Sequence, residues 1–236
     1  MHTDPPACEA AGHMQQLQAD TMNQLPLFDK MLDLPTDRII CADCMDILRT
    51  LPDKCIDLVL TDPPYGGSVC RTGGTWAEKY GKKVSSWDEA PAQEVFDELF
   101  RVSKNQIIWG GNYFDLPPTR CFNVWRKLTI SEAFTMAMCE YCWTSFDSNA
   151  KFWEYMPQGS ERFHPTQKPV PLIMRQLEEY ATPDMLILDP FAGSGTTAIA
   201  CHNLGMRCIS IERDEAYCQQ ANERLRAHKQ QMLLPL

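Results

Sequence analysis

The stretch that most constrains the fold is "MLILDPFAGSGTTAIACHNLGMRCISIERD", residues 185–214. An apolar strand pattern ends at Asp189, and Gly193-Ser194-Gly195 then opens a segment with a helical pattern. A second strand pattern ends at Glu212, 17 residues after Gly195. This order is typical of a nucleotide-binding βαβ unit, in which glycines let the backbone approach a ligand at a helix N-terminus. We therefore expect a parallel sheet and a carboxylate that accepts hydrogen bonds from ribose hydroxyls. A dinucleotide-binding enzyme would have the same arrangement.

Short β-rich runs alternate with helical patterns from residue 37 onward, as in parallel sheets with crossover helices. The predicted strands are 38–42, 55–60, 105–109, 121–125, 134–142, 185–188 and 207–211. The predicted helices are 44–51, 91–101, 169–181, 195–204 and 213–229. We expect one domain over 37–229, a flexible tail over 1–36 that lacks periodicity, and a short tail over 230–236.

A second informative stretch is "LVLTDPPYGG", residues 58–67. Prolines cannot donate to a sheet ladder, so the strand must stop at Asp62. Asp and Pro favour turns generally, and alone they would indicate an ordinary surface turn. Beside the glycine-rich turn, however, a strand end that presents a carboxylate, a rigid corner and an aromatic ring indicates a binding site. The carboxyl ends of parallel strands are where open α/β sheets bind ligands.

Three strings in one order resemble the motifs of amino-directed DNA methyltransferases. "DPFAGSGTT" resembles their S-adenosylmethionine-binding motif, "TDPPYG" resembles their catalytic motif, and "HPTQKPVPLIMRQLEEY" at 164–180 resembles the segment before the cofactor turn. The catalytic motif comes first, with Gly193 lying 131 residues after Asp62, as in the permuted, so-called beta, class. The resemblance covers nearly all of 37–228. "NQIIWGGNYF" and "CFNVWRKL" also resemble segments of phage-type members that methylate adenine N6.

The resemblance implies an α/β fold, a Rossmann-like methyltransferase domain with a mostly parallel seven-stranded sheet, helices on both faces and circularly permuted motif order. The strand at 38–42 would then lie beside the strand that ends at Glu212, which brings Asp43 toward the adenine ring of the cofactor. Thr166 and Lys168 are implied near the cofactor carboxylate, and His164 is assigned no chemistry. The implied cofactor-binding residues are Asp43, Thr166, Lys168, Asp189, Phe191, Ala192, Gly193, Ser194, Gly195, Thr196, Thr197 and Glu212.

The implied catalytic residues are Asp62, Pro63, Pro64 and Tyr65. The exocyclic amine of a base is a poor nucleophile, because its lone pair is delocalised into the ring. Asp62 can offer a carboxylate oxygen and Pro63 a carbonyl as acceptors for its hydrogens, while the prolines fix the corner. Tyr65 offers a face on which a flipped base can stack. In this family Asp at position 62 favours adenine N6, and cytosine N4 is the alternative.

Other function classes stay open at this point. Methylation of RNA or of a protein amide would use the same fold and a related corner. An inactive partner subunit is also conceivable, although the intact Asp62, Tyr65, Gly193 and Gly195 count against it. The sequence shows no nuclease-like appendage, and a separate restriction enzyme could accompany the protein.

The net charge of −9 is unfavourable for a protein that grips a polyanion, but its distribution is uneven. Five acids and one base lie in 1–35. The residues expected to contact double-stranded DNA are Arg71, Lys79, Lys82, Lys83, Arg126 and Lys127. Segments 66–90 and 130–163 are expected to contribute to recognition, with a homodimer as one way to enlarge this small surface. Trp125 is expected either to flank the flipped base or to belong to the core.

Within the tail, Gln24-Leu25-Pro26-Leu27-Phe28 resembles the peptide with which bacterial replication and repair proteins bind the DNA sliding clamp. The alternative is a strap that folds back onto the domain. Eleven cysteines mostly sit singly in apolar runs, which favours reduced thiols in a cytoplasmic protein. Two CxxC pairs lack a Gly-rich knuckle, so no metal site is expected. No stretch approaches the roughly 20 apolar residues of a membrane helix.

Overall fold

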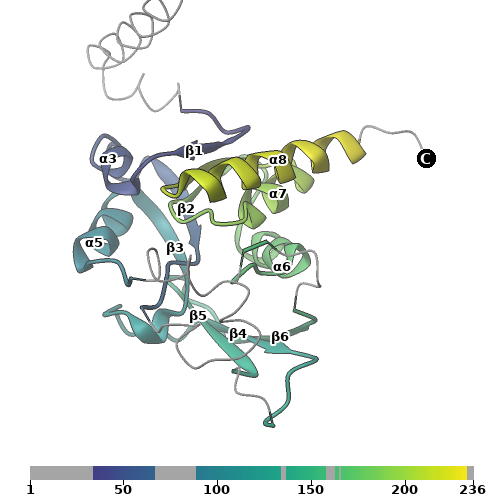
Figure 1. Ribbon diagram of the computed structural model, residues 1–236. Coiled ribbons are helices and arrows are strands. Elements are labelled where there is room, and N and C mark those ends of the chain that lie inside the picture. Colours follow the sequence, from purple (N-terminus) through teal and green to yellow (C-terminus); the bar gives the residue numbers. More distant parts are fainter. Residues whose placement is uncertain (1–33, 67–88, 134–136, 158–162, 165, 233–236) are drawn as a thin grey trace, which may run out of the picture.

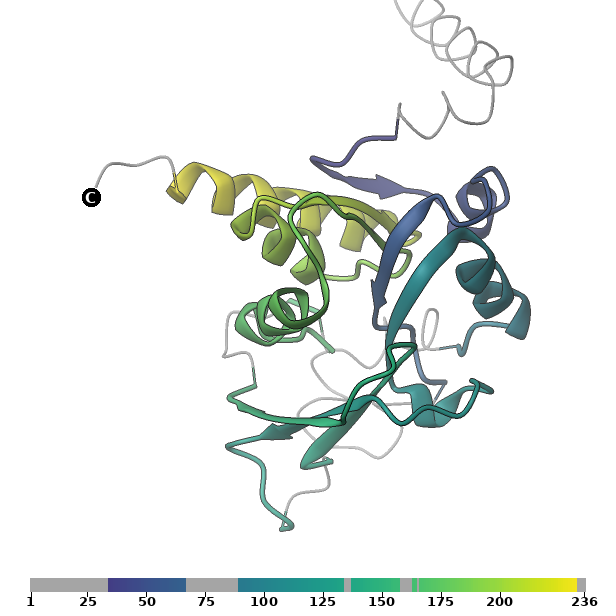
Figure 2. The ribbon, with the colours of Figure 1, turned by 180° about the vertical axis from the view of Figure 1, so that it is seen from behind.

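An eight-stranded sheet forms the centre of the molecule, and helices cover both of its faces (Figures 1 and 2). The computed structural model describes residues 34–66, 89–133, 137–157, 163–164 and 166–232. The strands are β1 (Ile39–Cys41), β2 (Ile56–Thr61), β3 (Ser103–Trp109), β4 (Phe122–Lys127), β5 (Cys139–Thr144), β6 (Lys151–Tyr155), β7 (Leu186–Asp189) and β8 (Arg207–Glu212). The helices are α3 (Cys44–Leu48), α5 (Gln93–Val102), the 3₁₀ turn η1 (Gly111–Tyr113), α6 (Val170–Tyr180), α7 (Thr196–Asn203) and α8 (Glu215–Met232).

The strand order is β1-β8-β7-β2-β3-β5-β4-β6. Every pairing is parallel except the two made by β5, which runs antiparallel to β3 and to β4. Strands β2, β7 and β8 therefore end at the same edge of the sheet. The expected mostly parallel α/β architecture is confirmed.

Both faces of the central strands are buried, and alternate residues enter different cores. On β2, Val59 packs into a cluster with residues of α3 and α5, such as Leu48 and Leu99. Its neighbours Leu58 and Leu60 pack into a second cluster with residues of α6 and α7. A third cluster joins α7, α8 and β1. Burial on both sides explains why "IDLVL" is a continuous apolar run rather than an alternating one.

The sheet has eight strands, so the prediction of seven is wrong. The additional strand is β6, with the sequence "KFWEY", which pairs in parallel with β4 at the edge of the sheet. Its residues alternate between half-buried and exposed positions, as expected for a strand with one covered face. A five-residue pattern of this kind is short, and it lies inside the segment that the sequence assigns to DNA recognition.

Several element bounds also differ from the predicted ones. β5 begins at Cys139 rather than at residue 134, and β3 begins at Ser103, immediately after α5 ends. The last helix runs to Met232, beyond the predicted end at residue 229. The N-terminal strand lies where the sequence places it, because β1 pairs in parallel with β8 and Cys41 is in register with Glu212.

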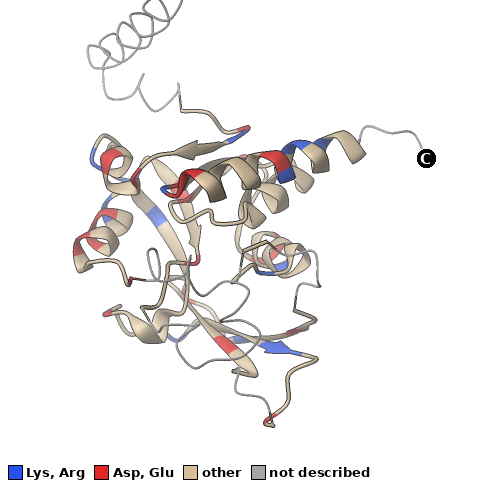
Figure 3. Cartoon of the chain, in the orientation of Figure 1, with Lys and Arg blue, Asp and Glu red and all other residues tan. Residues whose placement is uncertain are grey.

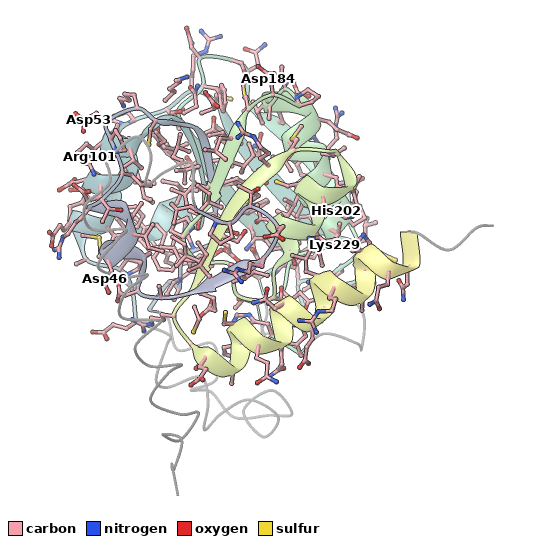
Figure 4. All side chains as sticks on the ribbon, turned by 90° about the horizontal axis from the view of Figure 1, so that it is seen from above. Asp46, Asp53, Arg101, Asp184, His202 and Lys229 are labelled. Atoms are coloured by element: carbon pink, nitrogen blue, oxygen red, sulfur yellow. The ribbon has the colours of Figure 1, made fainter. Side chains whose placement is uncertain are left out.

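Arg101 at the end of α5 fastens this helix to the segment before β2. Its guanidinium forms a 2.7 Å ion pair with Asp53 and donates to the carbonyls of Leu48 and Leu51. Arg101 and Asp53 lie beside each other at the periphery of the molecule (Figure 4). On the opposite side, Lys229 of α8 donates to the carbonyl of Asp37. These contacts hold the outer helices while the carboxyl edge of the sheet stays free for a site.

No helix in the described part of the chain is long and apolar enough to cross a membrane.

Candidate active site

The two motif-bearing strands, β2 and β7, are neighbours in the sheet. Val59 pairs with Leu188, so Thr61 and Asp189 end their strands side by side. The Thr61 hydroxyl donates to Asp189 Oδ1 at 2.9 Å, and both residues are buried. A pocket opens at this edge. It is lined by Leu60, Thr61, Asp62, Trp109, His164, Thr166, Gln167, Lys168, Ile173, Asp189, Phe191, Ala192, Gly193, Ser194, Thr196 and Thr197.

Asp62 follows β2 directly and both of its carboxylate oxygens have partners. The Tyr65 hydroxyl donates to Oδ1 at 2.7 Å, and the Lys168 ammonium lies 2.5 Å from Oδ2. Burial raises the pKa of Asp62 above its ordinary value, against the opposing influence of Lys168. The carboxylate is thus fixed in orientation and unusually basic for an aspartate.

Lys168 is buried and lies between two carboxylates. Its ammonium pairs with Asp62 and with Glu140 of β5, whose Oε2 is 3.1 Å away, and Glu140 pairs in turn with Lys127 at 2.6 Å. The ammonium also lies 4.9 Å from the centre of the Trp109 ring. Burial alone would lower the pKa of Lys168, but Asp62 and Glu140 outweigh it and raise the pKa. Lys168 therefore stays charged inside the protein.

The Tyr65 ring is held in a cage of aromatic and glycine residues. It stacks on Tyr113, with ring centres 4.8 Å apart and planes 15° apart, and meets the edge of Phe114. A Cβ atom on Gly110 would lie 2.1 Å from Tyr65 Cε1, and Gly110 has a φ of +69°. Only glycine fits both requirements. Tyr113 itself is 58% exposed, so this stack opens to solvent.

This cage yields a test of how firmly Tyr65 is held. We expect Gly110→Ala to lower the free energy of unfolding by about 1–3 kcal/mol more than Gly205→Ala, because the new methyl group overpacks the Tyr65 ring. Gly205 is a matched control, since its φ is +68° and a Cβ there would meet nothing within 4 Å. Urea unfolding of both variants makes the comparison. Equal losses of unfolding free energy in the two variants would mean that the Tyr65 ring can move away from the new methyl group without destabilising the protein.

The glycine-rich turn between β7 and α7 is shaped by backbone that only glycine adopts readily. Gly193 and Gly195 have φ values of +50° and +73°. The Glu212 carboxylate accepts the N–H of Gly193 at 2.8 Å and that of Asp214 at 2.9 Å. The Thr196 hydroxyl donates to the carbonyl of Lys168 at 3.3 Å, which joins the turn to the segment before α6. The turn and the Asp62 corner are therefore parts of one connected structure.

His164 and Thr166 lie in contact at the pocket wall. The Thr166 N–H lies 3.4 Å from Nδ1 of His164 and its hydroxyl lies 3.2 Å away, while the imidazole meets Tyr217 edge-on. Burial lowers the pKa of His164 to about 4, which keeps the ring neutral at physiological pH. A neutral ring suits a packing and hydrogen-bonding role.

Asp189 is a fully enclosed acid at the end of β7. Besides Thr61, the N–H of Phe191 donates to its Oδ1 at 3.2 Å. Burial raises its pKa from 3.8 to about 6, despite these hydrogen bonds. Because the folded state binds the proton more tightly than the unfolded state, stability is lost as the pH rises through 6.

Replacement of Asp189 by Asn should remove this pH dependence. An Asn oxygen can still accept from Thr61 and Phe191, but the side chain no longer titrates. We expect the wild type to lose about 1.4 kcal/mol more unfolding free energy than Asp189→Asn between pH 5 and pH 8. Urea unfolding at the two pH values measures this difference. Parallel losses in the two proteins would contradict the raised pKa.

The structure gathers most of the predicted cofactor residues, together with Asp62, around the pocket. Gly195, Asp43 and Glu212 do not line it. The Asp43 carboxylate caps α3 by accepting the Met45 N–H at 2.8 Å, at the end of β1 and next to β8. Asp43 thus lies just after β1 and Glu212 ends the adjacent strand β8, at the same edge of the sheet as the pocket.

The residues predicted to contact DNA separate into two kinds. Arg126 is exposed and pairs with Glu154 of β6 at 2.8 Å, at the end of the sheet where basic residues of β4 and β6 lie (Figure 3). Lys127 is buried and faces Glu140, and Trp125 belongs to the core. Arg71, Lys79, Lys82, Lys83 and the peptide Gln24, Leu25, Leu27 and Phe28 lie outside the described residues.

Three residues at the site, Glu140, Trp109 and Tyr113, lie outside the motifs by which the sequence predicts it. Glu140 is the one acid in the strand-like run "CEYCW", and a charge within an apolar strand is the signal that could have marked it. Cys139 and Cys142 beside it form one of the two CxxC pairs, for which reduced thiols are expected. No group of three or more His, Cys, Asp or Glu side chains in the described regions is arranged to hold a metal ion.

Comparison with known proteins supports the family and the fold. The N6/N4 methyltransferase family model, described as DNA methylase, matches residues 118–223. "Putative methylase YubD" of Escherichia coli (strain K12) is 30% identical over 225 residues, which cover 83% of this chain and 92% of that protein. The chain belongs to this family of DNA methylases.

Solved structures share the fold at lower identity. TTHA0409 of Thermus thermophilus, complexed with S-adenosyl-L-methionine, is 20% identical with a TM-score of 0.54, over 81% of this chain and 93% of that one. PvuII DNA methyltransferase, which is cytosine-N4-specific, is 14% identical with a TM-score of 0.54, over 85% of this chain and 96% of that one. These likenesses establish the Rossmann-like methyltransferase fold.

Proposed function

We propose that this protein is a DNA methyltransferase of the permuted beta class that methylates N6 of adenine and takes the methyl group from S-adenosylmethionine. The observation that carries the proposal is the pocket shared by Asp62 and the turn residues Gly193, Ser194, Thr196 and Thr197. A donor bound at the turn and an amine bound at Asp62 would therefore meet. Proximity of this kind supplies much of the rate of a transfer reaction.

The residues at this edge fit the proposed cofactor. Glu212 and Asp43 offer carboxylate oxygens for hydroxyl and amine groups, and the Gly193–Gly195 turn lets backbone approach a ligand. Phe191, Ala192 and Ile173 supply apolar lining. When bound, S-adenosylmethionine supplies a methyl group whose bond to sulfur breaks as a bond to nitrogen forms.

Asp62 is the proposed acceptor for the hydrogens of the target amine. Its two oxygens already accept from Tyr65 and pair with Lys168, but each carboxylate oxygen can accept more than one hydrogen bond. An added bond from the amine would favour a pyramidal nitrogen with a usable lone pair. The amine loses one proton in the reaction, and the basic Asp62 is placed to take it.

Tyr65 is the proposed stacking surface for the flipped base, and the Pro63-Pro64 corner fixes its position relative to Asp62. Pro63 is buried, in keeping with a rigid corner. The ring lies within 6.2 Å of Phe114 and stacks on Tyr113, so an aromatic wall is present for a base to join.

Adenine N6 is preferred over cytosine N4 because position 62 is Asp. Cytosine N4 is the second candidate, since the cytosine-N4-specific PvuII enzyme has the same fold with a TM-score of 0.54. RNA and protein amides are further candidates, and an inactive partner subunit is the last. The family membership makes DNA the first substrate to test.

The decisive experiment offers unmethylated plasmid DNA and S-adenosylmethionine to the purified protein and identifies methylated nucleosides by mass spectrometry. We expect N6-methyladenine, and a fall in rate of about 10²-fold or more in Asp62→Asn, since a preorganised electrostatic partner of the reacting group is lost. Asp46→Asn, an exposed carboxylate on α3, is the matched control and should keep full activity. Detection of N4-methylcytosine would mean that cytosine rather than adenine is the target. Detection of no methylated base would overturn the proposal.

A partner is proposed for the N-terminal peptide as well. The apolar anchors Leu27 and Phe28, with Gln24 as a polar register point, suit a groove on the DNA sliding clamp. Leu27→Ala with Phe28→Ala should abolish retention on immobilised clamp while methylation of short duplexes is unchanged. Equal retention of the double variant would remove the idea.

A further inference from the structure

Four buried or half-buried charges alternate in sign in a row that ends at the pocket. They are Lys127 of β4, Glu140 of β5, Lys168 before α6, and Asp62 after β2. The three ion pairs measure 2.6 Å, 3.1 Å and 2.5 Å in that order. The exposed side-chain fractions of Lys127 and Lys168 are 9% and 5%. Charges buried to this extent are costly unless they are paired. The alternation of sign gives each of the four charges at least one partner of opposite sign.

Lys168 has opposing effects on Asp62. Without a nearby cation, a carboxylate at this depth would take up a proton, which would make it a weaker acceptor and no longer a base. If the cation were paired with Asp62 alone, the carboxylate would be ionised but would be a weak base. Glu140 competes for the same ammonium, because Lys168 Nζ lies 3.1 Å from Glu140 Oε2 and 2.5 Å from Asp62 Oδ2. The positive charge of Lys168 is therefore shared between the carboxylates of Asp62 and Glu140.

We propose that Glu140 is a positioning residue for the methyl transfer: it shares the Lys168 ammonium with Asp62, so that Asp62, which Lys168 keeps ionised, remains a strong acceptor. The inference rests on the proposed function, since it assigns to Asp62 the role of acceptor. Lys127 holds Glu140 in turn, through the other carboxylate oxygen, Oε1.

The effect of pH on this site depends on every charged or titratable group that faces it. These groups come from β2, β4, β5, β7 and the segments beside them: Asp62, Tyr65, Lys127, Glu140, Cys142, His164, Lys168 and Asp189. Burial is the largest influence on the pKa of Asp62 and raises it. The charge of Lys168 lowers this pKa, and the charge of Glu140 raises it. Removal of the Glu140 charge should thus lower the pKa of Asp62.

The test replaces Glu140 by Gln, which keeps the shape of the side chain and removes its charge. We expect kcat on unmethylated plasmid DNA to fall about 10-fold, less than the roughly 10²–10³-fold loss of a group that contacts the reacting atoms. We also expect the acid limb of the pH–rate profile to move to lower pH, since Asp62 becomes less basic. Glu140→Asp should restore part of both changes.

Glu179→Gln is the matched control. Glu179 of α6 likewise pairs with two cations, Lys151 at 2.9 Å and Arg175 at 3.3 Å, but it does not line the pocket. Its replacement should leave the acid limb in place. If Glu140→Gln is poorly folded because Lys127 has lost its partner, the double variant Glu140→Gln with Lys127→Met removes both charges together and is measured instead.

A second measurement does not depend on catalysis. In the DNA-free protein, the carbon-13 resonance of the Asp62 carboxyl, assigned by its loss in Asp62→Asn, reports the pKa directly. We expect this pKa to fall in Glu140→Gln and to be unchanged in Glu179→Gln. An unchanged Asp62 pKa, or a lower kcat with an unmoved acid limb, would overturn the inference. Failure of the wild type to methylate DNA would instead overturn the proposed function, and the two failures are thus distinguishable.

Discussion

The pairing of β2 with β7 is the constraint on which the site depends. Val59 and Leu188 are in register, so the chain leaves both strands at the same height. The Thr61–Asp189 hydrogen bond then joins residues 128 positions apart in the sequence. Because the strands are parallel, the Asp62 corner and the glycine-rich turn extend from the same edge. Any slip in this register would move each motif to another height or face.

The second requirement is a network of hydrogen bonds and ion pairs that joins several polar groups at this edge. Glu212 accepts two backbone N–H groups, and the Thr196 hydroxyl reaches the carbonyl of Lys168. The ammonium of Lys168 joins β2 and β5 across the pocket wall. Such a network is costly to bury and strongly destabilised when one member is removed. It also leaves few alternative arrangements for Asp62 and Tyr65, which favours a preorganised site over an adaptable one.

The edge of the sheet beyond β3 has a different character. β5 runs opposite to the other strands, β4 and β6 return to the common direction, and β6 forms the edge of the sheet. Phe152 and Met156 lie exposed in and after β6, and Arg126 projects from β4 beside it. This part of the molecule brings Glu140 and Lys127 into the row of ion pairs that ends at Asp62, while its outer surface carries polar and apolar groups. Strands β4, β5 and β6 therefore carry both the buried or half-buried charges of Lys127 and Glu140 and the exposed side chains of Arg126 and Phe152.

The sequence by itself determined the local elements and the two motifs. Continuous apolar runs such as "LVL" and "LIL", and the glycines of the turn, reflect burial and backbone conformations that act within a few residues. The motif order also predicted that β1 lies beside β8. What only the tertiary structure decided are the contacts between distant segments: the added strand β6, the Tyr65–Tyr113 stack, and the burial of Lys127. The pairing of Lys168 with Glu140 belongs to the same group, because an ion pair depends on distance in space and leaves no periodic trace in the chain.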